Sequence, residues 1–324
     1  MMRKTAFIYP GQGAQHIGMG RDAAERYAAS AKIFEEADAA LGFGLTDLIF
    51  NGGEEELKIT ENTQPALLTV CVALTAPLVE AGIYPDAAAG LSIGEYAAHA
   101  LAGTFAFEGA VKAVRTRGKL MQEATPPGVG GMAAIIGLGA EEAESCCREA
   151  AASPECAGLV VEPVNYNCPG QIVIAGHAKA VETACALCKK RGAKRALMLA
   201  VSAPFHSSLM SGAGEKFAAE LAKLETGMMR IPVISNVTAE YVTCAEEAIS
   251  LLARQAASPV KWEQGVRAML AGGVGRFVEI GPGRTLAGFL KKIDESAEVI
   301  NVSDAASVEA AIGLLNRADE IVKN

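Results

Sequence analysis

Histidine, tryptophan and positive charge are scarce in this chain of 324 residues, which has four histidines and one tryptophan. Lys and Arg number 29 against 37 Asp and Glu, a net charge of −8. Because nucleic acids are bound through basic surfaces, this balance argues against nucleic acid as the main partner. The longest apolar stretch without a charge, residues 65–79, is short and contains threonine. We therefore expect no membrane span.

The cysteines lack the paired spacing of a metal site, and we expect no secretory leader. Of eight cysteines, Cys146 and Cys147 are adjacent, and Cys185 and Cys188 have no second pair of the same spacing. Zinc sites need such paired spacing, so we expect no metal. Residues 1–4 do not resemble a signal peptide, and we expect a cytoplasmic protein with reduced thiols.

What the chain does contain is typical of a compact enzyme. Hydrophobic residues make up 51% and charged residues 20%. The length allows one large domain or two smaller ones, and we find no internal repeat.

The pentapeptide Gly90-Leu91-Ser92-Ile93-Gly94 matches G-x-S-x-G, which places a serine on a sharp strand-to-helix turn. The flanks fit, because residues 87–91 favour a buried strand and residues 93–102 a helix that stops at Gly103. Such a turn exposes the Ser92 hydroxyl and places the Ile93 amide at a helix start, where negative charge is favoured. The alternative is a Gly-Ser loop that merely turns.

A second glycine-rich segment follows the predicted strand at residues 5–9. Gly11-Gln12-Gly13 lets the backbone approach another group closely, and the glutamine amide can bind an oxygen. Nucleotide binding is excluded, because the third glycine is absent and no Gly-Lys-Ser/Thr follows.

A serine nucleophile needs a base, and the chain offers four histidines. His16 lies in the glycine-rich loop, His99 about two turns into the helix after Ser92, and His177 at a strand end. His206 lies after a strand that ends at a proline, and catalytic groups gather in loops at strand ends. His206 is therefore the favoured base, although a lone histidine is often structural.

The middle of the chain has its own order of elements. Strand-like patterns cover residues 132–138, 159–165, 171–175 and 195–201, and helical patterns cover residues 140–151 and 178–191. The order βαββαβ predicts a ferredoxin-like unit. We expect it to span 128–199 as an insertion in a larger domain made of 1–127 and 200–324.

Seven motifs in this order resemble those of the malonyl-CoA:acyl carrier protein transacylases of fatty-acid synthesis, and together they span nearly the whole chain. They are Gly11-Gln12-Gly13-Ala14-Gln15, Gly90-Leu91-Ser92-Ile93-Gly94-Glu95, Arg117-Gly118-Lys119-Leu120-Met121-Gln122, Asn165-Tyr166-Asn167-Cys168-Pro169-Gly170-Gln171, Pro204-Phe205-His206-Ser207, Gln255-Ala256-Ala257-Ser258-Pro259-Val260-Lys261-Trp262 and Glu279-Ile280-Gly281-Pro282-Gly283.

The resemblance implies an α/β-hydrolase-like large domain with the ferredoxin-like insertion. It also implies ping-pong transfer of malonyl from malonyl-CoA to a serine and then to the phosphopantetheine thiol of acyl carrier protein, with no cofactor. Ser92 would be the nucleophile, His206 the base and Gln255 the carbonyl that orients it. The amides of Gln12 and Ile93 would form the oxyanion hole.

Arg117 matches the residue that clamps the free carboxylate of malonyl in this family, a task that suits the guanidinium fork. Without the resemblance it would be interpreted as a solvated helix residue. Many members have histidine where this chain has Leu91, a difference that we expect to affect packing or acyl fit.

Acyl carrier proteins are acidic, so docking on an acidic chain needs a local basic patch. The richest candidate comprises Lys189, Lys190, Arg191, Lys194 and Arg195. The alternative is a solvated helix end whose cations complement the helix dipole. We expect a monomer.

Other functions remain open at this stage. A serine thioesterase or hydrolase would use the same serine and histidine, with water taking the acyl group. A non-catalytic carrier-protein-binding module would not need the intact serine and histidine. A trans-acting polyketide acyltransferase would share every motif.

Overall fold

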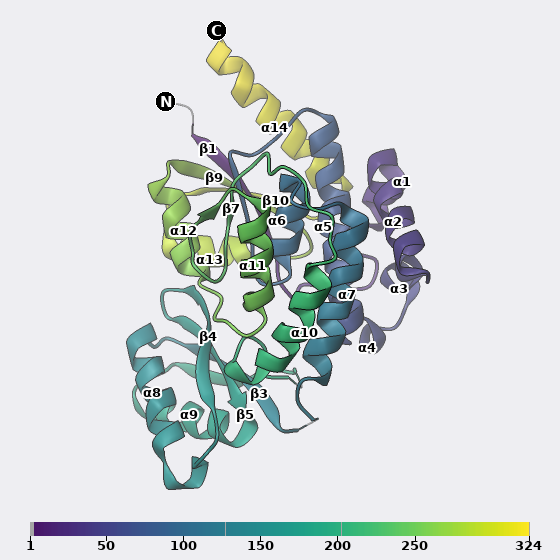
Figure 1. The fold of residues 1–324 in the computed structure, drawn as a ribbon. Coiled ribbons are helices and arrows are strands. Elements are labelled where there is room, and N and C mark those ends of the chain that lie inside the picture. Colours follow the sequence, from purple (N-terminus) through teal and green to yellow (C-terminus); the bar gives the residue numbers. More distant parts are fainter. Residues whose placement is uncertain (1–2, 127, 202, 324) are drawn as a thin grey trace.

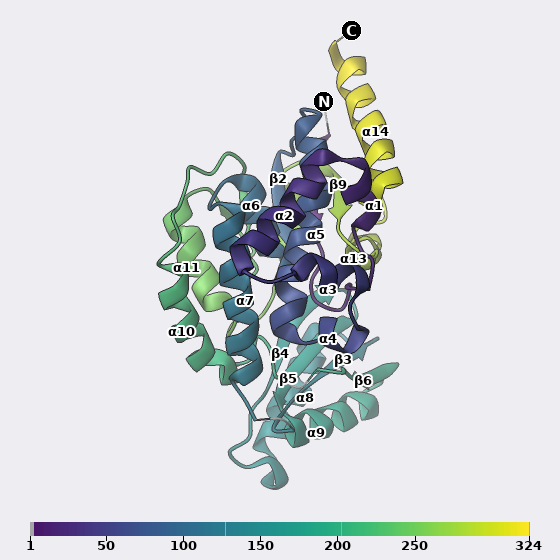
Figure 2. The ribbon, with the colours of Figure 1, turned by 90° about the vertical axis from the view of Figure 1, so that its right-hand side faces the viewer.

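The computed structural model describes residues 3–126, 128–201 and 203–323, with side chains to residue 316. It contains two sheets (Figures 1 and 2). Both views place the smaller sheet with two helices at one end of the molecule, and the C-terminal helix at the other.

The larger sheet has six strands in the order β10-β9-β1-β2-β7-β8 and is parallel except for β8. In chain order these strands are β1 (Lys4–Tyr9), β2 (Ala87–Gly90), β7 (Val233–Ile234), β8 (Tyr241–Val242), β9 (Val274–Ile280) and β10 (Glu298–Val302). Parallel strands buried on both faces need nearly continuous apolar sequence. The short, small-residue run of β2 meets that need.

Helices cover both faces of this sheet, because successive side chains of a strand point to opposite sides. This sheet has a hydrophobic core on each face, one larger than the other. Phe7 and Tyr9 pack into the larger core, and Ala6 and Ile8 pack into the smaller core on the opposite face. The larger core is covered by α1 (Arg21–Arg26), α2 (Ala28–Leu41), α3 (Leu45–Asn51), α4 (Glu54–Leu57), α5 (Thr60–Glu80), α6 (Gly94–Ala102), α7 (Phe107–Glu123), α10 (Ser211–Leu221), α11 (Ala245–Gln255) and α14 (Ala305–Lys323). The opposite face is covered by α12 (Trp262–Ala271) and α13 (Thr285–Ile293).

The smaller sheet is antiparallel, with the order β4-β5-β3-β6. Its elements are β3 (Gly130–Ile136), α8 (Ala140–Ala152), the short 3₁₀ helix η1 (Pro154–Cys156), β4 (Val161–Cys168), β5 (Gln171–His177), α9 (Ala178–Lys190) and β6 (Arg195–Met198). This is the predicted βαββαβ order. The predicted fold class, an α/β-hydrolase-like part with a ferredoxin-like unit, is confirmed.

The two parts meet where β4 contacts the segments before α10 and α12. Tyr166 donates its backbone N–H to Val260 O, and Val260 returns a bond to Val164 O, at 2.9 and 2.8 Å. Glu162 of β4 accepts two hydrogen bonds from Ser208, which begins the 3₁₀ helix η2 (Ser208–Met210). The division into 128–199 and the flanking segments stays a prediction, and residue 127 at its boundary lies outside the described residues.

One helix of the described chain, α5, is long and apolar enough to cross a membrane, and 83% of its most apolar window is buried inside the protein. We expected residues 65–79 to be too short to span a membrane. That expectation was wrong on length, because the helix begins at Thr60, five residues before Pro65. Its burial is that of a core helix.

Two other elements differ from the sequence patterns, and one stretch had no prediction. The pattern predicts a strand over 231–236 and a helix over 207–224, whereas β7 has two residues and α10 covers Ser211–Leu221. Nothing was predicted after Ile280, where the structure has α13, β10 and α14.

Candidate active site

Ser92 occupies the turn between β2 and α6 with φ of 53°, a left-handed conformation that is costly for a residue other than glycine. The glycines on either side are required by close backbone approach. A Cβ on Gly90 would lie 1.9 Å from the carbonyl carbon of Gly94, and one on Gly94 would lie 2.2 Å from Tyr9 O. The predicted strand–turn–helix context of Ser92 is therefore present.

His206 lies against this serine, with Nε2 2.7 Å from Ser92 Oγ. Its Nδ1 is 2.9 Å from the backbone oxygen of Gln255. A carbonyl can only accept, so Nδ1 carries the proton and Nε2 is free to accept one. Burial and then the positive charge of Arg117 lower the pKa of His206 to about 4, which keeps the imidazole neutral at pH 7.

The other three histidines have structural surroundings. His16 is exposed and contacts Ile17 O. His99 is buried, and its Nδ1 lies 2.9 Å from the Thr104 hydroxyl. His177 accepts a hydrogen bond from the Val160 N–H. Of the four candidates, only His206 contacts Ser92.

Arg117 is 1% exposed and reaches the same point from α7. Its Nη1 donates to Gln64 Oε1 at 2.7 Å, and its Nη2 donates to Gln255 Oε1 at 2.8 Å and to Ser92 Oγ at 3.1 Å. The guanidinium lies 5.4 Å from the centre of the Tyr96 ring, and its buried Nε has no hydrogen-bond partner among the residues that the structure describes. Burial lowers the pKa of Arg117. The alternative of a solvated helix residue is excluded.

The backbone amides of Gln12 and Ile93 lie on the two loops that flank the serine. Gln12 lies three residues after Tyr9, which pairs with Gly90 in the sheet. The two loops are close, because a Cβ on Gly11 would lie 2.9 Å from Leu91 O. Within the described part of the chain, neither amide donates a hydrogen bond to another group. Both are available to bind an oxyanion.

Sequence reasoning missed three polar side chains of this cluster, Gln64, Glu95 and Asn236, and it assigned no role to the side chain of Gln255. Asn236 accepts a hydrogen bond from the Ser92 N–H at 2.7 Å and donates to Gly90 O at 2.7 Å, so it holds the turn. The local sequence around Gln64 and Glu95 indicates only helix positions, in α5 and α6. Their separation from their partners in sequence hides their role.

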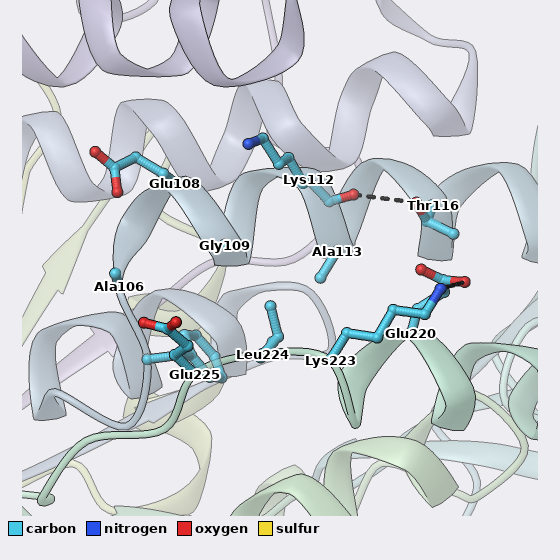
Figure 3. Close-up of a pocket in the computed structure, with 11 residues that line it drawn as sticks. Ala106, Glu108, Gly109, Lys112, Ala113, Thr116, Glu220, Lys223, Leu224 and Glu225 are labelled. Atoms are coloured by element: carbon cyan, nitrogen blue, oxygen red, sulfur yellow. Dashed lines mark hydrogen bonds and ion pairs between the residues drawn. The ribbon is translucent and has the colours of Figure 1, made fainter.

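A separate groove of about 420 Å³ lies between α7 and the chain after α10. Figure 3 shows Lys112 and Thr116 on one side, and Lys223 and Leu224 on the other. The residues around Ser92 do not line it. Among the described residues, no group of three or more His, Cys, Asp or Glu side chains is arranged to hold a metal ion.

Comparison with known proteins identifies the fold and the site with one family. The acyl transferase domain matches residues 6–321. The malonyl CoA-acyl carrier protein transacylase of Bacillus subtilis (strain 168) is 45% identical over 319 residues, which cover 98% of this chain and 99% of the relative. The chain belongs to the malonyl CoA-acyl carrier protein transacylase family.

Solved structures agree with this assignment. An acyl carrier protein S-malonyltransferase from Vibrio cholerae is 45% identical, with a TM-score of 0.91 over 95% of this chain and 99% of that one. A malonyl-transacylase solved in complex with a type II PKS acyl-carrier protein is 44% identical, with a TM-score of 0.92 over 96% and 99% of the two chains. The family predicted from the seven motifs is confirmed, and the protein is an acyltransferase. The roles of individual residues stay predictions.

Proposed function

We propose that this protein moves malonyl from malonyl-CoA to the phosphopantetheine thiol of an acyl carrier protein through an ester on Ser92. The observation that carries the proposal is the 2.7 Å contact between Ser92 Oγ and His206 Nε2 on a G-x-S-x-G turn. Family membership supports the substrate pair.

In the first half-reaction, Ser92 Oγ attacks the thioester carbonyl while His206 Nε2 takes its proton. Negative charge then develops on the carbonyl oxygen, next to the free amides of Gln12 and Ile93. Each donor of this kind contributes roughly 10²–10³ in rate. The C–S bond breaks, His206 returns the proton to the sulfur, and coenzyme A leaves.

In the second half-reaction the carrier-protein thiol loses its proton to His206 and attacks the ester on Ser92. The proton returns to Ser92 Oγ as the ester breaks. The histidine is oriented by the Gln255 carbonyl, which stabilises an imidazolium less than a carboxylate would. Because thiolates are good leaving groups, this weaker support is sufficient.

Arg117 would select for the carboxylate of the malonyl group. It is a buried cation beside the nucleophile, and its Nη2 contact with Ser92 Oγ is the one that a substrate carboxylate can replace. A guanidinium fork binds a carboxylate through two parallel hydrogen bonds. Leu91 lies at the edge of this site, half-buried, where it would contact the acyl group or its neighbours.

The choice between carrier proteins stays open. Relatives named as general transacylases and one solved with a polyketide carrier protein are 45% and 44% identical to this chain, so identity does not separate fatty-acid from polyketide supply. A thioesterase or hydrolase would use the same serine and histidine, but a buried Arg117 favours a carboxylated acyl group over a general ester.

The partner patch, the monomeric state, the cytoplasmic location and the absence of a cofactor remain predictions. The side chains of Lys189, Lys190, Arg191, Lys194 and Arg195 are exposed at the end of α9 and the start of β6. Arg191 forms an ion pair with Glu149, which reduces its availability to a partner.

The test is to incubate the protein with malonyl-CoA and identify the modified peptide by mass spectrometry. We expect a malonyl adduct on Ser92, lost in Ser92→Ala, and transfer to carrier protein faster than hydrolysis. Malonyl on another residue would refute the assignment of Ser92. Hydrolysis that outpaces transfer with carrier protein present would make the protein a hydrolase.

A further inference from the structure

Arg117 is a buried cation without a carboxylate beside it. Within the described residues it forms no ion pair, and its two terminal nitrogens donate to the neutral amide oxygens of Gln64 and Gln255. A buried charge that lacks compensation is strongly destabilising. The nearby structure must therefore supply a negative charge by another route.

The Gln255 side chain supplies that route. Its oxygen faces Arg117 at 2.8 Å, and its Nε2 donates to Glu95 Oε2 at 2.6 Å and to Ser92 O at 3.0 Å. The amide dipole thus points its negative end at the cation and its positive end at the carboxylate. Arg117 and Glu95 form a charge pair with one amide between them.

Glu95 is itself 1% exposed, and it also binds the segment that contains Asn236. Its Oε2 also accepts the backbone N–H of Asn236 at 3.2 Å, and Asn236 holds the Ser92 turn. The backbone carbonyl of Gln255 orients His206. His99 Nε2 lies 3.9 Å from the other carboxylate oxygen, beyond hydrogen-bond distance.

We propose that Glu95 is the counter-ion of Arg117, held at a distance through Gln255, and that this separation sets the preference for carboxylated acyl groups. The inference rests on the proposed function. A carboxylate in direct contact would occupy the guanidinium fork and compete with malonyl. A carboxylate one amide away compensates the buried cation and leaves the fork to exchange Ser92 Oγ for the substrate. Glu95 touches neither substrate nor reacting atoms and is a positioning residue.

Glu95→Gln tests the charge while keeping an oxygen acceptor for Gln255 and Asn236. Without the anion, a neutral acyl group leaves Arg117 wholly uncompensated, whereas malonyl brings its own carboxylate. The ratio of kcat/KM for malonyl-CoA to that for acetyl-CoA should rise by roughly tenfold, the scale of coupling between neighbouring groups. KM for malonyl-CoA should fall while kcat also falls. A ratio equal to that of wild type would overturn the proposal.

Two further variants separate charge from shape. Glu95→Asp keeps the charge but shortens the reach, so kcat should fall for both substrates with the ratio unchanged. In an Arg117→Ala background, Glu95→Gln should no longer change the acetyl rate relative to Arg117→Ala alone, and a persisting change would show that Glu95 does not act through Arg117. If Glu95→Gln fails to fold, Glu95→Asp still tests the proposal, because a changed ratio in this variant, which keeps the charge, would contradict it.

Glu108→Gln is the matched control, because Glu108 is an exposed acidic residue in the first turn of α7, as Glu95 is in the first turn of α6. It should leave the ratio unchanged. Wild type is measured alongside. Wild type without transfer through Ser92 would refute the proposed function, whereas normal transfer with a ratio insensitive to Glu95→Gln would refute only the counter-ion.

Discussion

The active site and the core of the smaller sheet bury titratable groups in opposite ways. Between α8 and α9 the core contains Cys146, Cys147, Cys185 and Cys188, all buried. Burial raises the pKa of Cys147 to about 12 and that of Cys185 to about 11, so these thiols stay neutral and pack as small apolar groups.

Around Ser92 the buried groups include the cation Arg117 and the carboxyl group of Glu95, and they are joined by hydrogen bonds from chain segments far apart in sequence. A thiol can be buried neutral with little penalty, but a charge needs partners. The comparison shows that burial alone does not mark a functional site. A functional site is marked by buried polar and charged side chains that are hydrogen-bonded to a nucleophile with a strained backbone.

The largest effect on the transfer rate should appear when one histidine is replaced in each region, His206 beside Ser92 and His177 in the smaller sheet. His206→Ala removes the base next to Ser92 and should lower kcat/KM for malonyl transfer by about 10²–10⁴. His177→Ala removes only the acceptor for the Val160 N–H in the smaller sheet, so it should affect thermal stability and leave the transfer rate near that of wild type. Steady-state rates and melting curves of both variants check this. Equal losses of rate would erase the distinction between the regions.

Arg117→Ala comes next, because it removes the buried charge that distinguishes the site. Breaking a buried carboxylate–guanidinium contact costs roughly 2–5 kcal/mol, a preference between about thirty-fold and a few thousand-fold for malonyl. The variant should lose malonyl transfer and keep or raise acetyl transfer. Arg117→Lys should restore part of the malonyl rate, since an ammonium lacks the two-pronged fork. The ratio of specificity constants is the measurement, and an unchanged ratio in Arg117→Ala would rule out the clamp.

The stability of the protein should also depend on pH through the buried His206 of the active site. The unfolded chain protonates His206 near pH 6.5, whereas the folded pKa is about 4. The contribution of His206 to the free energy of unfolding is therefore fully present above pH 6.5 and falls as the pH drops from 6.5 to 4. Below pH 4 this group causes no further loss. The loss amounts to about 3 kcal/mol at 1.36 kcal/mol per pKa unit.

Urea unfolding of wild type and His206→Gln at a series of pH values checks this. The difference between the two unfolding free energies should fall across that window. A difference that is flat from pH 7 to pH 4 would show that His206 titrates normally in the folded protein.

Much of the site could be predicted because its chemistry lies in short contiguous motifs. The Ser92 turn is indicated by its own pentapeptide, and the predicted strand and helix flank it as expected. The βαββαβ order followed from local periodicity. The network around Glu95 could not be predicted, because its bonds to Gln255 and Asn236 span 160 and 141 residues. Only the folded sheet brings those segments together, and Glu95 alone looks like an ordinary first-turn residue.

The smallest predicted effect concerns the surface of the smaller sheet. If the basic residues at the end of α9 dock an acidic carrier protein, Lys190→Glu should raise the apparent KM for carrier protein by roughly two- to fivefold, the scale of one exposed charge contact. Arg191→Glu should have less effect, because Arg191 is already paired with Glu149. KM for malonyl-CoA should stay nearly constant.

Lys216→Glu supplies the matched charge reversal, since Lys216 is exposed on α10 of the larger part, away from this patch. The effect of Lys190→Glu should shrink as salt rises, because exposed charges are screened within about 10 Å at 0.1 M. If both reversals raise KM equally, long-range net charge steers the carrier protein. If neither does, the basic residues only complement the dipole of α9, and the carrier protein binds elsewhere.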